Sequence, residues 1–353
     1  MDCSRPFTQP TLLPLHDRQG HVWDRYGKDM PEHSFEPIRG TLERFTFSSI
    51  NLENELGDPV EREVVVHIPP NAEGSLPCII YLAPFTGTGF ARANWQAFSE
   101  TLPQRHERLV KEGKMGPAIL VMPDTFTSLG GNQFIDSSIM GDWGTWLSQD
   151  LCEELNTRYQ INGFGLVGKS SGGYGSLVRG MLDDCWGAVA CHSGDCGFDT
   201  MFSADLLSCA TAAKIAGGTM NLFESLKNKS KLSGNDFHHL MIIAMAASYD
   251  DSFELPIDLE SGEIIEERWN NWLSWDPLRM IEDLQDLPPV WIDVGNADQY
   301  HIQYGLRCLH NRMELLEISH EWEEFEGTHS GIDHRLDLSL PWMYGSLTSS
   351  KKL

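Results

Sequence analysis

A serine flanked by glycines is the residue of this sequence best suited to nucleophilic chemistry. Ser170 lies in the run GKSSG at 168–172, which matches the G-x-S-x-G pattern. The short apolar run Phe164–Val167 precedes it, and a helical pattern from Ser171 to about Leu182 follows directly. In a strand–turn–helix context the glycines leave room for a tight turn that lifts the serine hydroxyl above a sheet. We therefore predict that Ser170 is a nucleophile.

An acid and a base follow Ser170 in the chain. The apolar run Val290–Val294 ends in Gly-Asn-Ala-Asp, which places Asp298 just beyond a strand. The last such run ends in Glu-Gly-Thr-His, which gives His329 the same relative position. In α/β-hydrolases the catalytic residues have the order Ser, Asp or Glu, His, each in a loop after a strand. We predict that His329 takes the serine proton and that Asp298 orients the imidazole.

Each of these two residues has competitors. Asp298 has an alternative role as the cap of a helix that we expect from Tyr300, and Asp293 competes for the acid position. We favour Asp298 because Asp293 lies inside a strand, where its side chain would face a helix layer. The imidazole has three competitors, of which none directly follows the last strand: His334, His301 and His192.

An oxyanion hole requires two N–H donors near the serine. The first is the N–H of Ser171 at the start of the helix. The second is expected from the loop after the third strand, APFTGTG at 83–89. Pro84 has no N–H, which leaves Phe85 or Thr86, although an ordinary turn is the alternative.

A different function is suggested by a second motif over the same residues. The run GFGLVGKS at 163–170 matches the phosphate-binding loop G-x-x-x-x-G-K-S, with Asp293 as a candidate Mg²⁺ ligand. In that loop a strand precedes the first glycine, whereas residues 156–162 are polar and the intervening Phe-Gly-Leu-Val has strand character. We therefore disfavour a nucleotide-binding protein.

The elements that must position these residues alternate along the chain. Short buried apolar runs alternating with helical patterns indicate a mainly parallel sheet with helices on both faces, which is an α/β fold. The first two strands have no helix between them, which suggests an antiparallel start. The expected strands are Thr41–Leu52, Glu61–Pro69, Cys78–Leu82, Ala118–Met122, Phe164–Val167, Ala188–Cys191, Val290–Val294 and His320–Phe325. The expected helices are Asn94–Glu112, Asp142–Tyr159, Ser171–Leu182 and Tyr300–Leu316.

Two segments do not follow this alternation of strands and helices. Residues 1–40 are expected to form an N-terminal extension over the core, which comprises residues 41–195 and 277–353. Residues 196–276 are expected to form a helical cap at the carboxyl edge of the sheet, where open α/β folds bind ligands. Tryptophans recur there every three residues, at Trp269, Trp272 and Trp275. One interpretation is a substrate pocket formed by Thr86, Trp269 and Trp272. The other, which we favour for the indoles, is packing in the core. His238, His239 and the acidic loop 250–267 are interpreted as solvated surface, and no metal site is expected.

Composition narrows the class of protein. The 353 residues carry a formal net charge of −25, which disfavours nucleic acid and anionic membranes as partners. Eight cysteines are scattered without a CxxC pair, which predicts buried free thiols. The N-terminus has no secretory pattern, and no apolar stretch has membrane-spanning length, so we expect a cytoplasmic protein without a cofactor, and we leave a homodimer open.

Several segments together resemble the esterase D-like family of α/β-hydrolases, which includes enterochelin esterase-type enzymes. The resemblance spans about residues 60–335 and is most specific in the run GKSSGGYGSL at 168–177; HSGD at 192–195 also contributes. It implies an α/β-hydrolase fold, a triad of Ser170, Asp298 and His329, and an oxyanion hole made by the backbone of Phe85 and Ser171. The chain departs from the family in Ala83-Pro84, where many relatives carry His-Gly, and in the long cap.

These observations favour a carboxylic-ester hydrolase that acts on a small-molecule ester through an acyl-enzyme. The same machinery serves an acyltransferase or a peptidase, so both remain alternatives. A hydrolase fold used only as a binding module is disfavoured because all three triad positions are filled.

Overall fold

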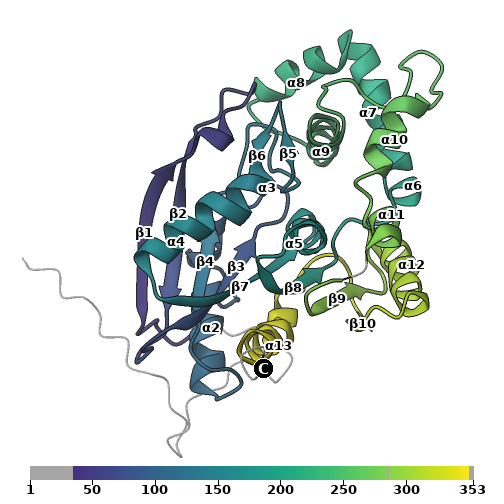
Figure 1. The fold of residues 1–353 in the computed structure, drawn as a ribbon. Helices are drawn as coiled ribbons and strands as arrows, with labels where there is room; N and C mark the ends of the chain where they lie inside the picture. The colour runs from purple at the N-terminus through teal and green to yellow at the C-terminus, as the bar shows by residue number, and fades with distance from the viewer. Residues whose placement is uncertain (1–34, 285, 350–353) are drawn as a thin grey trace, which may run out of the picture.

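The computed structural model describes residues 35–284 and 286–349 (Figure 1). The expected N-terminal extension, residues 1–40, lies outside the described residues except for its last six. An eight-stranded sheet forms the centre of the molecule. Its strand order is β1 (Thr41–Ser48), β2 (Glu61–Ile68), β4 (Ile119–Pro123), β3 (Leu76–Leu82), β7 (Ile161–Lys169), β8 (Trp186–His192), β9 (Val290–Gly295) and β10 (Glu321–Phe325).

The sheet is mainly parallel. Strands β4, β3, β7, β8, β9 and β10 are parallel to one another, whereas β2 pairs antiparallel with both β1 and β4. The antiparallel start and the α/β fold class are therefore as predicted. Strands β3 and β4 are buried along their full length, as expected for strands covered on both faces.

Helices cover both faces of the sheet and produce two hydrophobic layers. One layer holds α1 (Gly89–Ala93), α2 (Leu102–Lys111) and α13 (Leu336–Ser349). The other holds α3 (Trp143–Thr145), the π-helical turn η2 (Trp146–Leu151), α4 (Cys152–Arg158), α5 (Ser171–Leu182) and α12 (Ile302–Leu315). Both layers bury the apolar side chains that gave the helical periodicity in the sequence.

Two of the expected helices differ from the observed ones. The helix expected over 94–112 begins only at Leu102, because Thr101 caps it through a reciprocal capping box with Gln104. Residues before Thr101 form a short bridge between Gln96 and Ser99 instead. The helix expected over 142–159 is continuous but passes through the π-helical turn η2.

Helices also fill the segment between β8 and β9, of which residues 196–276 are called the cap below. These helices are α6 (Phe198–Met201), α7 (Ser203–Ala216), α8 (Thr219–Lys227), α9 (Gly234–Tyr249) and α10 (Glu266–Leu273), followed by α11 (Pro277–Met280) and η3 (Ile281–Asp283). Helix α9 is buried over most of its last three turns and packs against α7 and α8. In Figure 1 the cap helices α7–α10 stand together at one end of the molecule.

The remaining elements are short: η1 (Ile50–Leu52), the β5 (Asp136–Ser137) and β6 (Gly141–Asp142) hairpin, and η4 (Asp333–Arg335). All seven described cysteines are free, but only five are buried. Cys185 and Cys308 are exposed and depart from the prediction of buried thiols, because Cys185 lies in the turn between α5 and β8 and Cys308 lies on the outer face of α12. Among the described residues, no helix combines the length and the apolar character that a membrane span needs.

Candidate active site

Ser170 occupies a sharp turn between β7 and α5. Its backbone has φ 56° and ψ −127°, a conformation that costs a non-glycine residue free energy and is typical of functional sites. The backbones at the turn approach so closely that side chains have no room. A Cβ on Gly168 would lie 2.2 Å from the Gly172 oxygen, and one on Gly172 would lie 2.1 Å from the Leu82 oxygen. The glycines of the motif are therefore required by the strand–turn–helix crossing, as the elbow interpretation predicts.

The phosphate-loop interpretation of the same residues is wrong. Residues 161–169 form strand β7, and the Phe-Gly-Leu-Val between the two glycines pairs with β3 and β8 in the middle of the sheet. Backbone N–H groups in a central strand bond to neighbouring strands and are not free to surround a phosphate.

Asp298 and His329 meet at the carboxyl ends of neighbouring strands. Asp298 follows β9 and His329 follows β10, and the Asp298 Oδ2 lies 2.8 Å from the His329 Nδ1. The other carboxylate oxygen accepts the N–H of Tyr300 at 2.8 Å, so Asp298 also holds the turn before α12, as its alternative role suggested. Both side chains are buried. Because the carboxylate binds Nδ1, Nε2 is the nitrogen of His329 left for proton transfer.

The imidazole is held from two further sides. The backbone N–H of His329 donates to the Gln299 side-chain oxygen at 3.0 Å. The ring of Tyr300 meets the His329 ring edge-on, with centroids 4.8 Å apart. These contacts fix the orientation that a general base requires.

The competing acid and base form a separate buried pair. The Asp293 Oδ1 lies 2.7 Å from the His192 Nδ1, and the Asp293 Oδ2 accepts the indole N–H of Trp291 at 3.0 Å and the guanidinium of Arg335 at 2.9 Å. Burial opposes ionisation of Asp293, but interaction with His192, Trp291 and Arg335 holds its pKa below the usual range. The two other competing imidazoles, His301 and His334, are exposed.

Ser170 and His329 line the same cavity, whose volume is about 420 Å³. The core contributes Phe85, Thr86, Lys169 and Tyr300 to its wall, among others. The cap contributes an apolar set of side chains from α6 and α9: Met201, Phe237, Met241 and Met245. The cavity thus lies between the carboxyl edge of the sheet and the cap helices.

The structure distinguishes the two candidates for the second oxyanion donor. The N–H of Thr86 donates to the Gly130 oxygen at 2.6 Å, so it is already engaged. Among the described residues, no acceptor faces the N–H of Phe85, and none faces that of Ser171 at the first position of α5. The ring of Phe85 packs on Gly130 and Gly131, where added Cβ atoms would lie 3.0 and 2.9 Å from it. This packing fixes the loop in which the Phe85 N–H lies.

Of the predicted pocket residues, only Thr86 lines the cavity. Trp272 is fully buried in an aromatic cluster of the cap, with ring centroids 5.6 Å from Phe202, 5.5 Å from Tyr249 and 5.8 Å from Trp269. Trp269 lies half-buried against this cluster and donates its indole N–H to Asp199 at 3.1 Å. The two indoles therefore contribute to the core of the cap, which is the interpretation that the spacing favoured.

Sequence reasoning missed the polar groups of the cavity wall. Gln133 is 1% exposed, yet neither its side-chain oxygen nor its nitrogen has a partner among the described residues. The buried hydroxyl of Ser171 is likewise unpartnered. Burial, with a smaller contribution from Asp298, raises the pKa of Asp195 to about 7. We call Gln133, Ser171 and Asp195 the polar floor. Asp195 carried a signal in the sequence as the last residue of HSGD, and Ser171 carried one through its backbone N–H, whereas Gln133 carried none.

His238 also departs from its predicted place. Sequence reasoning put it on the solvated surface, but its side chain lines the cavity and is only half-exposed. Its Nδ1 lies 3.0 Å from the Asp205 Oδ1, and its ring lies 5.6 Å from that of Tyr300. Because α9 lines the cavity that holds Ser170 and His329, a residue near the start of that helix reaches it.

Solved structures share this architecture. An S-formylglutathione hydrolase from Agrobacterium tumefaciens has a TM-score of 0.55 at 16% identity, covering 88% of this chain and 97% of that one. The fluorophosphonate-binding serine hydrolase FphF of Staphylococcus aureus, with substrate bound, has 0.53 at 13%, covering 86% and 98%. A ferulic acid esterase from Anaeromyces mucronatus in complex with ferulic acid has 0.51 at 16%, covering 87% and 92%.

The chain has the α/β-hydrolase fold. The structural neighbours include esterase D-like S-formylglutathione hydrolases and feruloyl esterases of the α/β-hydrolase superfamily, so the predicted resemblance is confirmed at the level of structure. No protein-family profile and no curated protein sequence matches the chain. In an α/β-hydrolase of this topology, the cavity that holds Ser170 lies at the carboxyl edge of the parallel strands, where ligands bind.

Proposed function

We propose that this α/β-hydrolase is a serine carboxylic-ester hydrolase that acts through an acyl-enzyme on small esters. The proposal rests on one observation above all. The Asp298–His329 hydrogen bond lies at the wall of the same cavity as Ser170, with the unoccupied N–H groups of Phe85 and Ser171 beside it. The neighbouring structures of serine hydrolases and esterases support the same class of reaction.

The mechanism follows from these positions. The Ser170 Oγ attacks the ester carbonyl while the His329 Nε2 takes the hydroxyl proton, and Asp298 stabilises the imidazolium. The N–H groups of Phe85 and Ser171 bind the oxyanion of the tetrahedral intermediate. Collapse of the intermediate breaks the ester C–O bond, and the imidazolium returns its proton to the departing alcohol. Water, deprotonated by His329, then attacks the acyl-enzyme and releases the acid and free Ser170.

The release of p-nitrophenolate from p-nitrophenyl acetate in a stopped-flow instrument tests this function. We expect a burst of about one equivalent per chain if deacylation is slower than acylation, followed by steady turnover. Ser170→Ala should remove both phases. Ser176→Ala is the matched control, because it deletes a buried hydroxyl of the same helix that does not line the cavity. Turnover that survives Ser170→Ala would reject the proposal.

The polar floor suggests what the substrate carries. A buried amide with both hydrogen-bonding groups free costs free energy unless a ligand satisfies it. We propose that Gln133 binds a hydroxyl or similar group of the substrate, beyond the apolar contacts made by the methionines of the cap. The ferulic acid of one structural neighbour is an acid of this polar-aromatic type.

Paired esters test this specificity. We expect kcat/KM for methyl ferulate to exceed that for methyl cinnamate, which lacks the ring hydroxyl and methoxyl groups. Gln133→Met keeps the shape but removes the hydrogen bonds, and should reduce this preference by roughly tenfold or more, since a hydrogen bond to a buried group is worth about 1–3 kcal/mol. An unchanged preference in Gln133→Met would show that Gln133 does not bind the substrate, and it would leave the ester hydrolase itself intact.

A further inference from the structure

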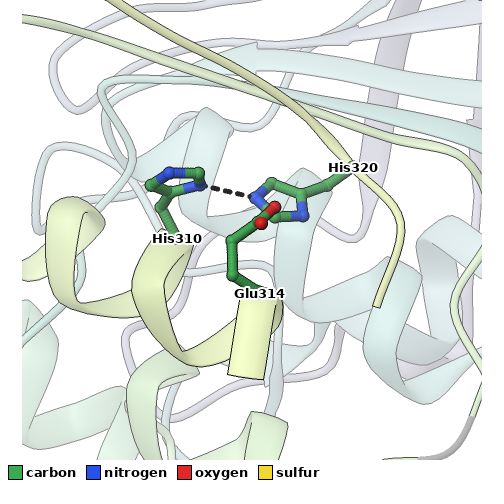
Figure 2. Close-up of side chains that lie close together, drawn as sticks. All are labelled: His310, Glu314 and His320. Carbon is green, nitrogen blue, oxygen red and sulfur yellow. Dashed lines mark hydrogen bonds between the residues drawn. The ribbon is translucent and has the colours of Figure 1, made fainter. Parts of the chain in front are cut away.

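Two histidines and a glutamate lie together far from Ser170, where α12 ends and β10 begins (Figure 2). His310 and Glu314 are four residues apart on α12 and therefore share one face of the helix. His320 directly precedes β10. The ligand atoms of the three side chains all lie within 4.8 Å of one another. Figure 2 shows the two imidazoles facing each other, with the Glu314 carboxylate beside His320.

The two imidazoles have the geometry of ligands to one ion. The His310 Nδ1 lies 2.8 Å from the His320 Nε2. Two nitrogens that each lie about 2.1 Å from a zinc ion are roughly 3.0–3.4 Å apart at bond angles between 90° and tetrahedral. A widening of a few tenths of an ångström would therefore admit the ion. A hydrogen bond between two imidazoles joins one donor and one acceptor, whereas an ion would use both nitrogens as donors of electron pairs.

The surroundings already fix the form of His320 that a metal needs. The His320 Nδ1 lies 2.9 Å from the Ile318 carbonyl oxygen, which can only accept, so Nδ1 carries the proton. The Nε2 lone pair then points toward His310. A metal-bound histidine is commonly oriented in this way, by its second nitrogen donating to a carbonyl group. On ion binding the proton of His310 moves from Nδ1 to Nε2 through solvent.

The other two ligands are also suited to the site. The His310 ring stacks on Trp322, with centroids 4.9 Å apart and an interplanar angle of 7°, which limits its rotation. The Glu314 side chain is exposed and makes no hydrogen bond or ion pair with any described residue, so its carboxylate is free to turn toward an ion. Two imidazoles and one carboxylate are ligands that Zn²⁺, Ni²⁺ and Cu²⁺ accept, with water completing the shell.

We propose that His310, Glu314 and His320 bind a divalent transition-metal ion of the zinc class, which ties α12 to β10. The place of the site in the fold indicates a structural role. Helix α12 begins just after Asp298, and β10 leads at its other end to His329, so the ion would fasten the two elements that carry the acid and the base. Among the described strands, β10 lies at the edge of the sheet and pairs with β9 alone, so a bound ion would add a second attachment for this strand.

Calorimetric titration of the chelator-treated full chain with zinc chloride tests the site. We expect one ion per chain, and we expect saturating zinc to raise the melting temperature. His310→Ala and His320→Ala should each weaken zinc binding at least about tenfold, since even outer-shell changes have effects of that size. His239→Ala is the matched control, because it removes a half-buried imidazole of the cap and should leave zinc binding unchanged.

Two further variants keep the result decisive. Glu314→Gln changes an exposed side chain, so it should fold normally and weaken zinc binding several-fold. Cu²⁺ bound at the site should quench the fluorescence of Trp322, whose indole stacks on His310. Trp322→Phe should therefore still bind Cu²⁺ but show less quenching of the tryptophan fluorescence. Ester hydrolysis should be unchanged in Glu314→Gln. Zinc binding that is equal in His310→Ala, His320→Ala and the unaltered protein, or that is lost equally in His239→Ala, would overturn the proposal.

Discussion

Two groups of a serine, a histidine and an aspartate stand out in the described part of the chain, and the one that is hydrogen-bonded throughout lies away from the cavity. In the buried set, the Ser339 Oγ lies 2.8 Å from the His192 Nε2, and the His192 Nδ1 lies 2.7 Å from the Asp293 Oδ1. All three side chains are buried within the α13 layer and the sheet, and none lines the cavity. In the other set, Asp298 and His329 bond in the same way, but Ser170 and His329 both reach the 420 Å³ cavity.

The two sets differ in whether their polar atoms remain available to a substrate. Trp291 and Arg335 occupy the remaining oxygen of Asp293, and Ser339 occupies the remaining nitrogen of His192, so the buried set has no group left for a substrate. Its role is structural. It holds His192, whose carbonyl oxygen accepts the N–H of Ser170 at 2.9 Å. The buried set therefore supports the turn that presents the accessible serine, and residue types alone do not tell the two apart.

Removal of each serine gives the largest expected contrast. Ser170→Ala should lower kcat for p-nitrophenyl esters by roughly 10⁶-fold, the scale seen when a nucleophilic serine is deleted. Ser339→Ala should keep kcat within about tenfold, because it removes one buried hydrogen bond, worth about 1–3 kcal/mol of stability. Steady-state kinetics with thermal melting of both variants measures this. Equal losses of kcat in the two variants would break the distinction between the sets.

The second largest effect on kcat is expected when each aspartate is replaced by asparagine. Asp298→Asn should lower kcat by about 10⁴-fold with little change in melting temperature, because the amide favours the wrong tautomer of His329. Asp293→Asn should act mainly on stability, at a cost of up to about 3–5 kcal/mol, because it removes the buried negative charge that His192 and Arg335 face, although Arg335 keeps Glu323 as its second partner. Urea unfolding and ester kinetics on both variants separate the two effects, and the reverse pattern would exchange the roles of the two acids.

A third buried carboxyl group, that of Asp195, extends the comparison of Asp293 with Asp298. Unlike those two aspartates, it is not hydrogen-bonded to a histidine among the described residues. Its pKa is raised to about 7, so the folded protein binds more protons at this group than the unfolded chain between about pH 4 and pH 7. The contribution of Asp195 to stability therefore falls as the pH rises through that window. Asp195→Asn should gain stability relative to the unaltered protein by roughly 2–4 kcal/mol from pH 4 to pH 7, with no further gain above it.

Urea unfolding at intervals of one pH unit from 4 to 9 measures that difference. Subtraction of the two curves removes the titration of all other groups. A difference that stays constant with pH would mean that Asp195 ionises normally inside the cavity wall.

The sequence predicted most of the sheet and the pairing of Asp298 with His329, because short buried strands leave local signals. Ser170, Asp298 and His329 each follow directly on an apolar run, so chain position alone indicated their common edge. Gln133 left no such signal, because its burial results from strands and helices that meet only in the folded molecule. His238 was missed for the same reason, since the packing of α9 beside the cavity is a tertiary feature.

Two patterns needed the structure to separate their alternatives. The run GFGLVGKS fits a phosphate loop by residue type, and only its place in strand β7 rejects that interpretation. The N–H of Thr86 is lost as an oxyanion donor through a hydrogen bond to Gly130, more than forty residues away in the chain. Contacts at such separation carry no periodicity that a sequence pattern can reveal.

Labelling with a fluorophosphonate probe tests the accessible set most directly. The reagent phosphonylates an activated serine, and digestion followed by mass spectrometry locates the modified residue. We predict one label per chain on Ser170, unchanged in Ser339→Ala and absent in Ser170→Ala. Labelling that persists in Ser170→Ala, or that appears on Ser339, would contradict the assignment of Ser170 as the nucleophile.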